Sequence, residues 1–284
     1  MKKKVFFLTG GLANQLFQII GGSWLANQHN FEITFDKTYV DRQHDKTDFL
    51  KNLMPELNFK VSKFRRFIAQ KIPFFNKLYF YFLGKFHLIK NDEDLNNIKI
   101  NEKYIIGYFQ NFKFFDLSPT ITNLMKTKLY ELSPNKFDPK LTVKPYLVVH
   151  VRCGDFLGKS YPTRQLDEKW YINAYDKIKN NHKFLKTIIL TNNKIDLQNY
   201  YINFLNHVAI YEIVDPEIMD TLSTFRFLMD SKLKLIGNST FAILAAKFSQ
   251  GIVYVPDSLI SDSAESDLVK TFPITWNKIK SSWI

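Results

Sequence analysis

Cysteine is nearly absent from the chain: Cys153 is the only one among 284 residues, so no disulfide can form within the molecule. Long apolar runs are absent too, and no stretch approaches the roughly 18 consecutive apolar residues of a membrane-spanning helix. These absences exclude a disulfide-stapled scaffold and an integral membrane helix. They fit a reducing compartment, and we expect a cytoplasmic protein.

The pattern at the start of the sequence also argues against a signal peptide. The apolar residues 5–8 are followed at once by Thr9, Gly10 and Gly11, which leaves the apolar core too short for secretion. We interpret residues 4–9 as a first buried strand instead.

Acidic residues are outnumbered, with 27 Asp and Glu against 39 Lys and Arg, a net charge of +12. Such a field attracts nucleic acid, an acidic membrane surface or a phosphorylated ligand. Residues 57–91 contain no acid at all, but eight basic residues and ten aromatics. This segment fits two helices divided at Pro73 with solvated lysines, a surface for anionic lipid headgroups, or a platform for single-stranded nucleic acid.

The length favours two lobes, because single cores stop growing near about 250–300 residues. Turn formers gather at residues 133–139. We therefore predict an N-terminal lobe over 1–135, a C-terminal lobe over 140–262, and a C-terminal helix over 263–284 able to pack back across the first lobe. In the second lobe, apolar strands alternate with helices, which predicts an α/β fold with a doubly wound parallel sheet. The predicted strands are 146–151, 187–191, 208–214, 232–237 and 252–255, and the helices are 167–179, 194–205, 218–229 and 240–248.

The most informative stretch follows the strand over 146–151. His150 lies near its end, and Arg152, Gly154 and Asp155 come next. The carboxyl ends of strands in open α/β sheets face the ligand crevice. Arg152 can donate two hydrogen bonds to a phosphate, Gly154 allows a sharp turn, and Asp155 can act as a base or orient Arg152. The alternative is an Arg–Asp pair exposed to solvent at a strand end.

Two further turns can bind an anion or a sugar. Gly10 and Gly11 connect the first strand to a helix, and residues 237–241 connect a strand to the helix that Ser239 or Thr240 caps. Backbone N–H groups at a helix start suit a phosphate. Each turn also fits an ordinary glycine turn or N-cap. The dinucleotide pattern G-x-G-x-x-G is absent. Asp92 and Asp94 have the D-x-D form of metal-binding transferases, but we interpret them as a solvated helix cap and expect no metal.

Three stretches in this order resemble a known family. Residues 10–18, GGLANQLFQ, resemble the G-G-L-G-N-Q-M-F-Q opening of the bacterial α-1,2-fucosyltransferases, glycosyltransferase family 11. Residues 150–156, HVRCGDF, resemble the family's H-x-R-R-G-D-Y motif, and residues 236–241, IGNSTF, its I-x-N-S-S-F segment. The resemblance spans about residues 4–256.

The resemblance implies a GT-B architecture, with two Rossmann-like lobes, parallel sheets and an interlobe cleft. It implies inverting, metal-independent transfer of L-fucose from GDP-β-L-fucose to the 2-hydroxyl of a terminal galactose. The acceptor would be an oligosaccharide of O-antigen or surface polysaccharide synthesis, lipid-linked at the inner face of the cytoplasmic membrane, where residues 57–91 would make peripheral contact.

The same resemblance assigns roles to residues. Arg152 would neutralise the β-phosphate, Asp155 is the candidate base, and His150 supports the catalytic strand end. Substrate binding is expected from these residues: Gly10, Gly11, Asn14, Gln15, Gly154, Asn192, Asn238, Ser239, Thr240 and Phe241. The chain departs from the family where Cys153 replaces a second arginine and where Asn192 and Asn193 replace acidic residues.

Two other functions stay open. A GT-B transferase for another nucleotide sugar would differ in donor competition, because GDP but not UDP should protect a fucosyl enzyme. A basic nucleic-acid-binding protein would show salt-dependent binding to oligonucleotides. The complete alternation of strands and helices in the second lobe argues against nucleic acid as a partner.

Overall fold

The structure is a computed structural model that describes residues 2–38, 49–62, 86–89, 101–133, 145–154, 165–214, 219–260 and 267–283. The chain divides into two compact units, residues 1–128 and 129–284. The division falls inside helix α6 (Pro119–Leu132). Each unit has a parallel sheet of its own, and the two units are described separately.

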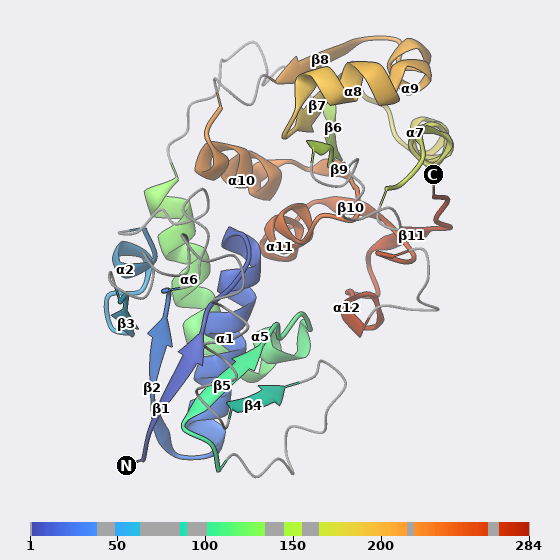
Figure 1. The fold of residues 1–284 in the computed structure, drawn as a ribbon. Coiled ribbons are helices and arrows are strands. Elements are labelled where there is room, and N and C mark those ends of the chain that lie inside the picture. Colours follow the sequence, from blue (N-terminus) through green and yellow to red (C-terminus); the bar gives the residue numbers. More distant parts are fainter. Residues whose placement is uncertain are drawn as a thin grey trace. The chain divides into compact units, whose positions relative to one another are not determined.

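The first unit is built around a five-stranded parallel sheet (Figure 1). Its strands are β1 (Lys2–Phe7), β2 (Phe31–Asp36), β3 (Asn58–Lys60), β4 (Phe86–Ile89) and β5 (Tyr104–Gly107). They lie in the order β3-β2-β1-β5-β4. The helices described here, besides α6, are α1 (Leu12–Gln28), α2 (Phe49–Leu53) and α5 (Lys113–Leu117). The predicted βαβ opening is thus confirmed, with β1 in the middle of the sheet.

Strand β4 corrects the prediction of two helices across residues 57–91. Residues 86–89 pair in parallel with β5, and residues 58–60 form β3 beside β2. A run of four mostly apolar residues has no periodicity that separates a strand from a helix, so the sequence alone could not decide. Residues 63–85 and 90–91 lie outside the described residues, and the prediction of a lipid-facing surface there stays a prediction.

Gly21 in α1 makes room for a buried aromatic ring. A Cβ on Gly21 would lie 2.2 Å from Cδ1 of Phe109. Phe109 is only 1% exposed, has a φ of +53°, and packs on Phe6 with ring centroids 5.5 Å apart. We expect Gly21→Ala to lower the free energy of unfolding by roughly 1–3 kcal/mol, because overpacking outweighs the better helix propensity of alanine.

Urea denaturation measures this loss. Gly11→Ala is the matched control, since a Cβ at Gly11 meets no atom within 4 Å and the φ there is −70°. A Gly21→Ala protein as stable as the Gly11→Ala protein would contradict the close packing of Phe109 on α1.

The second unit contains a six-stranded parallel sheet in the order β11-β10-β9-β6-β7-β8. Its strands are β6 (Tyr146–Val151), β7 (Lys186–Thr191), β8 (Tyr211–Val214), β9 (Leu233–Ile236), β10 (Ile252–Pro256) and β11 (Asn277–Ile279). Its helices include α7 (Glu168–Asn181), α8 (Lys194–Tyr200), α9 (Ile202–His207), α10 (Thr221–Asp230), α11 (Thr240–Phe248) and α12 (Asp267–Lys270). Numbered along the chain from β6, the order is 3-2-1-4-5-6, the order of Rossmann folds. The predicted α/β class, with a Rossmann-like parallel sheet in each unit, is confirmed.

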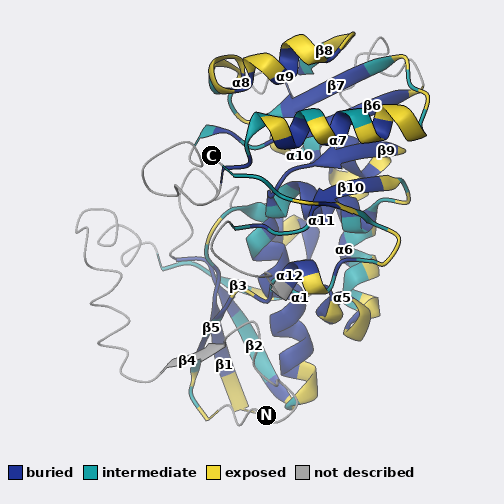
Figure 2. Cartoon of the chain, turned by 90° about the vertical axis from the view of Figure 1, so that its right-hand side faces the viewer, coloured by how far each residue is buried: buried dark blue, intermediate teal, exposed yellow. Residues whose placement is uncertain are grey.

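Strand β6 is buried along its whole length because helices cover both faces of its sheet. Leu147 and Val149 lie in a core cluster with residues of α7, α8 and α9. On the opposite face, Tyr146 stacks on Phe227 of α10, with ring centroids 5.7 Å apart. Figure 2 shows the result, with β6 and most of β7 buried and the outward sides of α7 and α8 exposed. This two-sided cover explains the unbroken apolar run of residues 146–149 in the sequence.

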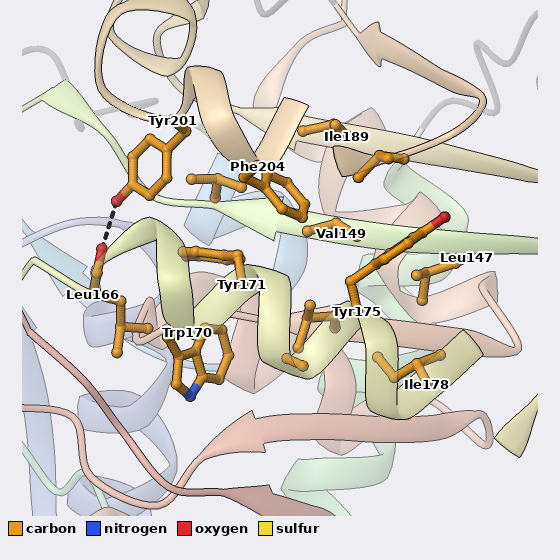
Figure 3. Packing of buried hydrophobic residues seen from close by; sticks show 14 of the residues in the cluster. Leu147, Val149, Leu166, Trp170, Tyr171, Tyr175, Ile178, Ile189, Tyr201 and Phe204 are labelled. Carbon is orange, nitrogen blue, oxygen red and sulfur yellow. Dashed lines mark hydrogen bonds between the residues drawn. The ribbon is translucent and has the colours of Figure 1, made fainter. Parts of the chain in front are cut away.

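Aromatic side chains fill the core between β6 and the helices α7–α9 (Figure 3). The ring of Tyr171 contacts Trp170, Tyr201 and Phe204, with centroids 4.8 to 5.5 Å apart. The buried Tyr201 hydroxyl donates a hydrogen bond to the Leu166 carbonyl at 2.8 Å. The predicted helix over 194–205 is two helices, α8 and α9, because the chain bends at Tyr201 to place this ring in the core.

The C-terminal tail differs from the predicted helix over 263–284. Only α12 is helical there among the described residues, and β11 joins the sheet beside β10 in parallel register. Pro273 interrupts the helical pattern, since it has no N–H to donate. Asp257 then fixes the tail, accepting hydrogen bonds from Ser281 N at 2.8 Å and Ser281 Oγ at 2.7 Å. Among the described helices, none combines the length and apolarity needed to cross a membrane.

Candidate functional site

The predicted site residues follow strands at the topological switch point of each sheet. In the second unit, the chain runs from β6 to β7 and β8 on one side, and to β9, β10 and β11 on the other. In the first unit, β1 and β5 are the corresponding pair. Open α/β sheets bind ligands at the carboxyl ends of such strand pairs. The turn after β6, the turn after β9 and the turn after β1 all lie at these positions.

The turn after β6 is held by two side chains of the neighbouring β7–α8 segment. Cys153 N donates to Asn192 Oδ1 at 2.8 Å, and Asn192 Nδ2 donates back to the Cys153 carbonyl at 3.1 Å. Gly154 N donates to Asp196 Oδ2 at 3.0 Å. Gly154 has a φ of +68°, which confirms the expected need for glycine in this turn. Arg152, half-buried, extends from this fixed segment.

His150 is a neutral histidine beside Arg152. It is 5% exposed, and burial, followed by the positive charge of Arg152, lowers its pKa to about 3. Its buried Nδ1 has no hydrogen-bond partner among the described residues, and its ring lies 6.3 Å from that of Phe241. His150 therefore adds no positive charge at neutral pH, in keeping with a supporting role.

The Cys153 thiol is not set up as a nucleophile. Its side chain is fully buried, and burial raises its pKa to about 11 against the lowering effect of a hydrogen bond with Thr191. The thiolate, the reactive form, is therefore scarce at neutral pH. A small packed thiol is the better description. A side chain buried here also cannot replace the phosphate contact of the second arginine in the resembled motif.

The turn after β9 begins helix α11 next to the end of β6. Gly237 N donates to the His150 carbonyl at 3.2 Å, which ties the two strand ends together. Buried Asn238 donates through Nδ2 to the Leu259 carbonyl at 3.3 Å. Buried Ser239 is the N-cap residue of α11, and its side chain makes no capping hydrogen bond. Thr240 and Phe241 belong to the first turn of α11, so the backbone N–H groups of that turn lie at the switch point.

The glycine turn after β1 is supported by the first residues of α1. Gly10 has a φ of +73°, and its carbonyl accepts a hydrogen bond from buried Gln15 Nε2 at 2.8 Å. Gly11 is the N-cap residue of α1. Asn14 Oδ1 accepts from Gln110 Nε2 at 2.9 Å, which links the turn to the end of β5. Gln15 therefore stabilises the turn, whereas Asn14 connects the turn after β1 with the residues that follow β5.

Several predicted residues lie outside the described part of the chain. Asp155, the candidate base, is one of them, and so are Asp92 and Asp94. Among the described residues, no group of three or more His, Cys, Asp or Glu could hold a metal ion. The base and the absence of a metal requirement therefore stay predictions.

The sequence reasoning missed two side chains, Asp196 and Gln110. The sequence signal for Asp196 was the end of the predicted strand over 187–191; in the structure, β7 pairs in parallel with β6 from Tyr146↔Lys186 to Val151↔Thr191. That register places the residues after Thr191 beside the turn after Val151. Gln110 had no comparable signal, since it depends on the positive φ of Phe109 before it.

No protein-family model matches the chain, and no curated protein matches it. Solved structures resemble it at low identity. POFUT1 in complex with GDP gives a TM-score of 0.46 at 10% identity, covering 89% of this chain and 98% of that chain. Fucosyltransferase NodZ from Bradyrhizobium gives 0.47 at 12%, covering 88% and 94%.

A third resemblance is to a Listeria monocytogenes protein described as a candidate UDP-N-acetylglucosamine 2-epimerase. Its TM-score is 0.46 at 10% identity, covering 92% of this chain and 81% of that chain. Values this low carry no argument about activity. The fold described above rests on the sheets of this chain itself.

Proposed function

We propose that the protein is an inverting glycosyltransferase that moves L-fucose from GDP-β-L-fucose to the 2-hydroxyl of a terminal galactose. One observation carries the proposal: two of the stretches that resemble α-1,2-fucosyltransferases meet at one switch point. Arg152 follows β6, residues 238–241 follow β9, and the Gly237–His150 hydrogen bond joins the two strand ends. The acceptor we propose is a galactose-terminated oligosaccharide of surface polysaccharide synthesis.

The chemistry of this strand pair suits a leaving diphosphate. Negative charge builds on GDP as the sugar–oxygen bond breaks, and a fixed cation stabilises that charge most in the transition state. The guanidinium group of an arginine is a cation that can donate two parallel hydrogen bonds to a phosphate. The first turn of α11 adds backbone N–H groups and the positive end of a nine-residue helix.

The remaining roles are assigned by the same proposal. Asp155 takes the proton of the acceptor hydroxyl in a single displacement, as inversion requires a base on the acceptor side. The turn after β1, with Asn14, contributes acceptor contacts. No metal ion is required.

The test is release of GDP from GDP-fucose, with and without lactose, in excess EDTA. We expect release that depends on lactose and resists EDTA, and that free GDP inhibits while UDP does not. Release that stops in EDTA would contradict the metal-independent mechanism. Release from a different nucleotide sugar, with none from GDP-fucose across a series of β-galactosides, would overturn the choice of donor.

A further inference from the structure

The segment that carries Arg152 is fixed by side chains outside the strand to which it belongs. Asn192 uses both ends of its amide on the Cys153 backbone, and Asp196 accepts the Gly154 N–H. Cys153 and Gly154 have then left the β6 ladder, so these three hydrogen bonds replace the ones that a sheet would supply. These hydrogen bonds to the neighbouring β7–α8 segment take no partner away from the strand pairing of β6. They limit the directions in which the side chain of Arg152 can extend.

We propose that Asn192 and Asp196 are positioning residues that set the direction of Arg152 by fixing the backbone of Cys153 and Gly154. The proposal rests on the proposed function, in which Arg152 contacts the diphosphate. It gives Asn192 a task different from the substrate contact suggested by the sequence. It also gives a task to Asp196, whose own position is fixed because its backbone N–H donates to Asn193 Oδ1 at 3.0 Å.

The turn packs closely against Asn192, which restricts the backbone that carries Arg152. Gly154 has a left-handed backbone, and a Cβ there would lie 2.8 Å from Asn192 Nδ2, so the amide and the turn are in close contact. Arg152 precedes the clamped Cys153 directly and follows the buried end of β6. A displacement of the turn by about 1 Å therefore shifts the backbone from which the Arg152 side chain extends, and misplacements of that size can cost about 10²-fold in rate.

The lone cysteine supplies a readout that needs no substrate. Cys153 is the only thiol in the chain, and it is fully buried inside the clamped turn. A thiol reagent such as a maleimide can reach it only when the turn opens. We expect Asn192→Ala and Asp196→Ala to raise the alkylation rate about tenfold or more, the change expected for loss of one such hydrogen bond. Asp196→Asn, which keeps an acceptor for Gly154 N, should stay near the parent rate.

The second readout is binding of GDP, measured by calorimetry, together with KM and kcat for GDP-fucose. Asn192→Ala and Asp196→Ala should weaken GDP binding by about tenfold, and Asp196→Asn should recover most of it. Asp257→Ala is the control for a general loss of stability, because the Asp257 carboxylate accepts its hydrogen bonds from the tail at Ser281 and not from Cys153 or Gly154. It should leave both readouts close to those of the parent.

Each outcome decides something. An unchanged alkylation rate of Cys153 in Asn192→Ala and Asp196→Ala would contradict the proposal that these two side chains fix the turn. Faster alkylation with unchanged GDP affinity would show a structural role only, and would overturn the positioning of Arg152. A parent protein that binds no GDP would defeat the proposed function instead, while alkylation would still decide whether the two side chains hold the turn.

Discussion

Replacing Arg152 with alanine is expected to lower kcat/KM for fucosyl transfer by roughly 10²–10³. That is the usual loss when one preorganised donor to a developing negative charge is removed. Arg152 emerges where β6 ends, next to the switch point at which the proposed diphosphate would bind. Within the described residues 150–154, Arg152 is the only positive side chain, since His150 is kept neutral by a pKa of about 3 and residue 153 is a buried cysteine.

The loss should fall mainly on kcat. The diphosphate carries charge in the donor as well, so GDP binding weakens, but the bridging oxygen gains its charge only as the bond to fucose breaks. Steady-state measurements of GDP release across a range of GDP-fucose concentrations separate the two effects. Arg152→Lys keeps the charge but loses the paired N–H donors, and we expect its activity to lie between those of the parent and Arg152→Ala.

Arg226→Ala is the matched control for this experiment. Arg226 belongs to the same unit, but its guanidinium donates to Asp230 Oδ2 at 2.7 Å and to the Tyr130 carbonyl at 2.6 Å. Its loss removes a structural arginine and leaves the β6 turn untouched, so kcat/KM should change little. An Arg152→Ala protein with parent-like turnover would contradict the assignment of this arginine to the leaving group.

The parts of the fold that the sequence predicted best are those with strong local signals. The bounds of β6 and α11 agree with the predicted 146–151 and 240–248, because a largely apolar run and an N-cap serine mark them directly. The strand–helix alternation that predicted a parallel sheet is confirmed. Once the strands are in Rossmann order, the two motifs of the second unit must meet at one edge.

The parts that failed depend on contacts distant in the sequence. Strand β11 forms because Asn277–Ile279 can pair with the edge of β10. No local pattern in the tail sequence predicts this pairing. The hydrogen bond between Asn192 and Cys153 likewise joins residues 39 positions apart. Its position follows from the β6–β7 register, which the sequence leaves open until the sheet order is known.

The second unit buries the ammonium group of Lys234, and this burial lowers the stability of the folded protein. It is 0% exposed on β9, between Val148 of β6 and Val253 of β10. Burial lowers its pKa from 10.5 to about 7, against the raising effect of Asp230. Its Nζ donates to Ser249 Oγ, which also accepts from Gly251 N at 3.1 Å. The ammonium therefore has a hydrogen-bond acceptor in Ser249, but among the described residues no carboxylate forms an ion pair with it.

The folded pKa lies below the unfolded value, so the unfolded state binds more protons between about pH 7 and pH 10.5. Stability from this residue therefore rises with pH through that window, and the cost of burial is fully present below it. A shift of this size corresponds to roughly 3–6 kcal/mol. Lys234→Met removes the charge while keeping much of the side-chain volume, and Ser249 retains its bond from Gly251.

We therefore expect Lys234→Met to be more stable than the parent by several kcal/mol at pH 6.5, with a much smaller difference near pH 10. Urea denaturation of both proteins at the two pH values gives the comparison, in which titration of all other groups cancels. Lys232→Met, two residues earlier and exposed, is the control and should show no such dependence on pH. An equal stability difference at both pH values would mean that Lys234 does not carry the lowered pKa. A Lys234→Met protein less stable than the parent at pH 6.5 would mean that the hydrogen bond to Ser249 outweighs the cost of burying the charge.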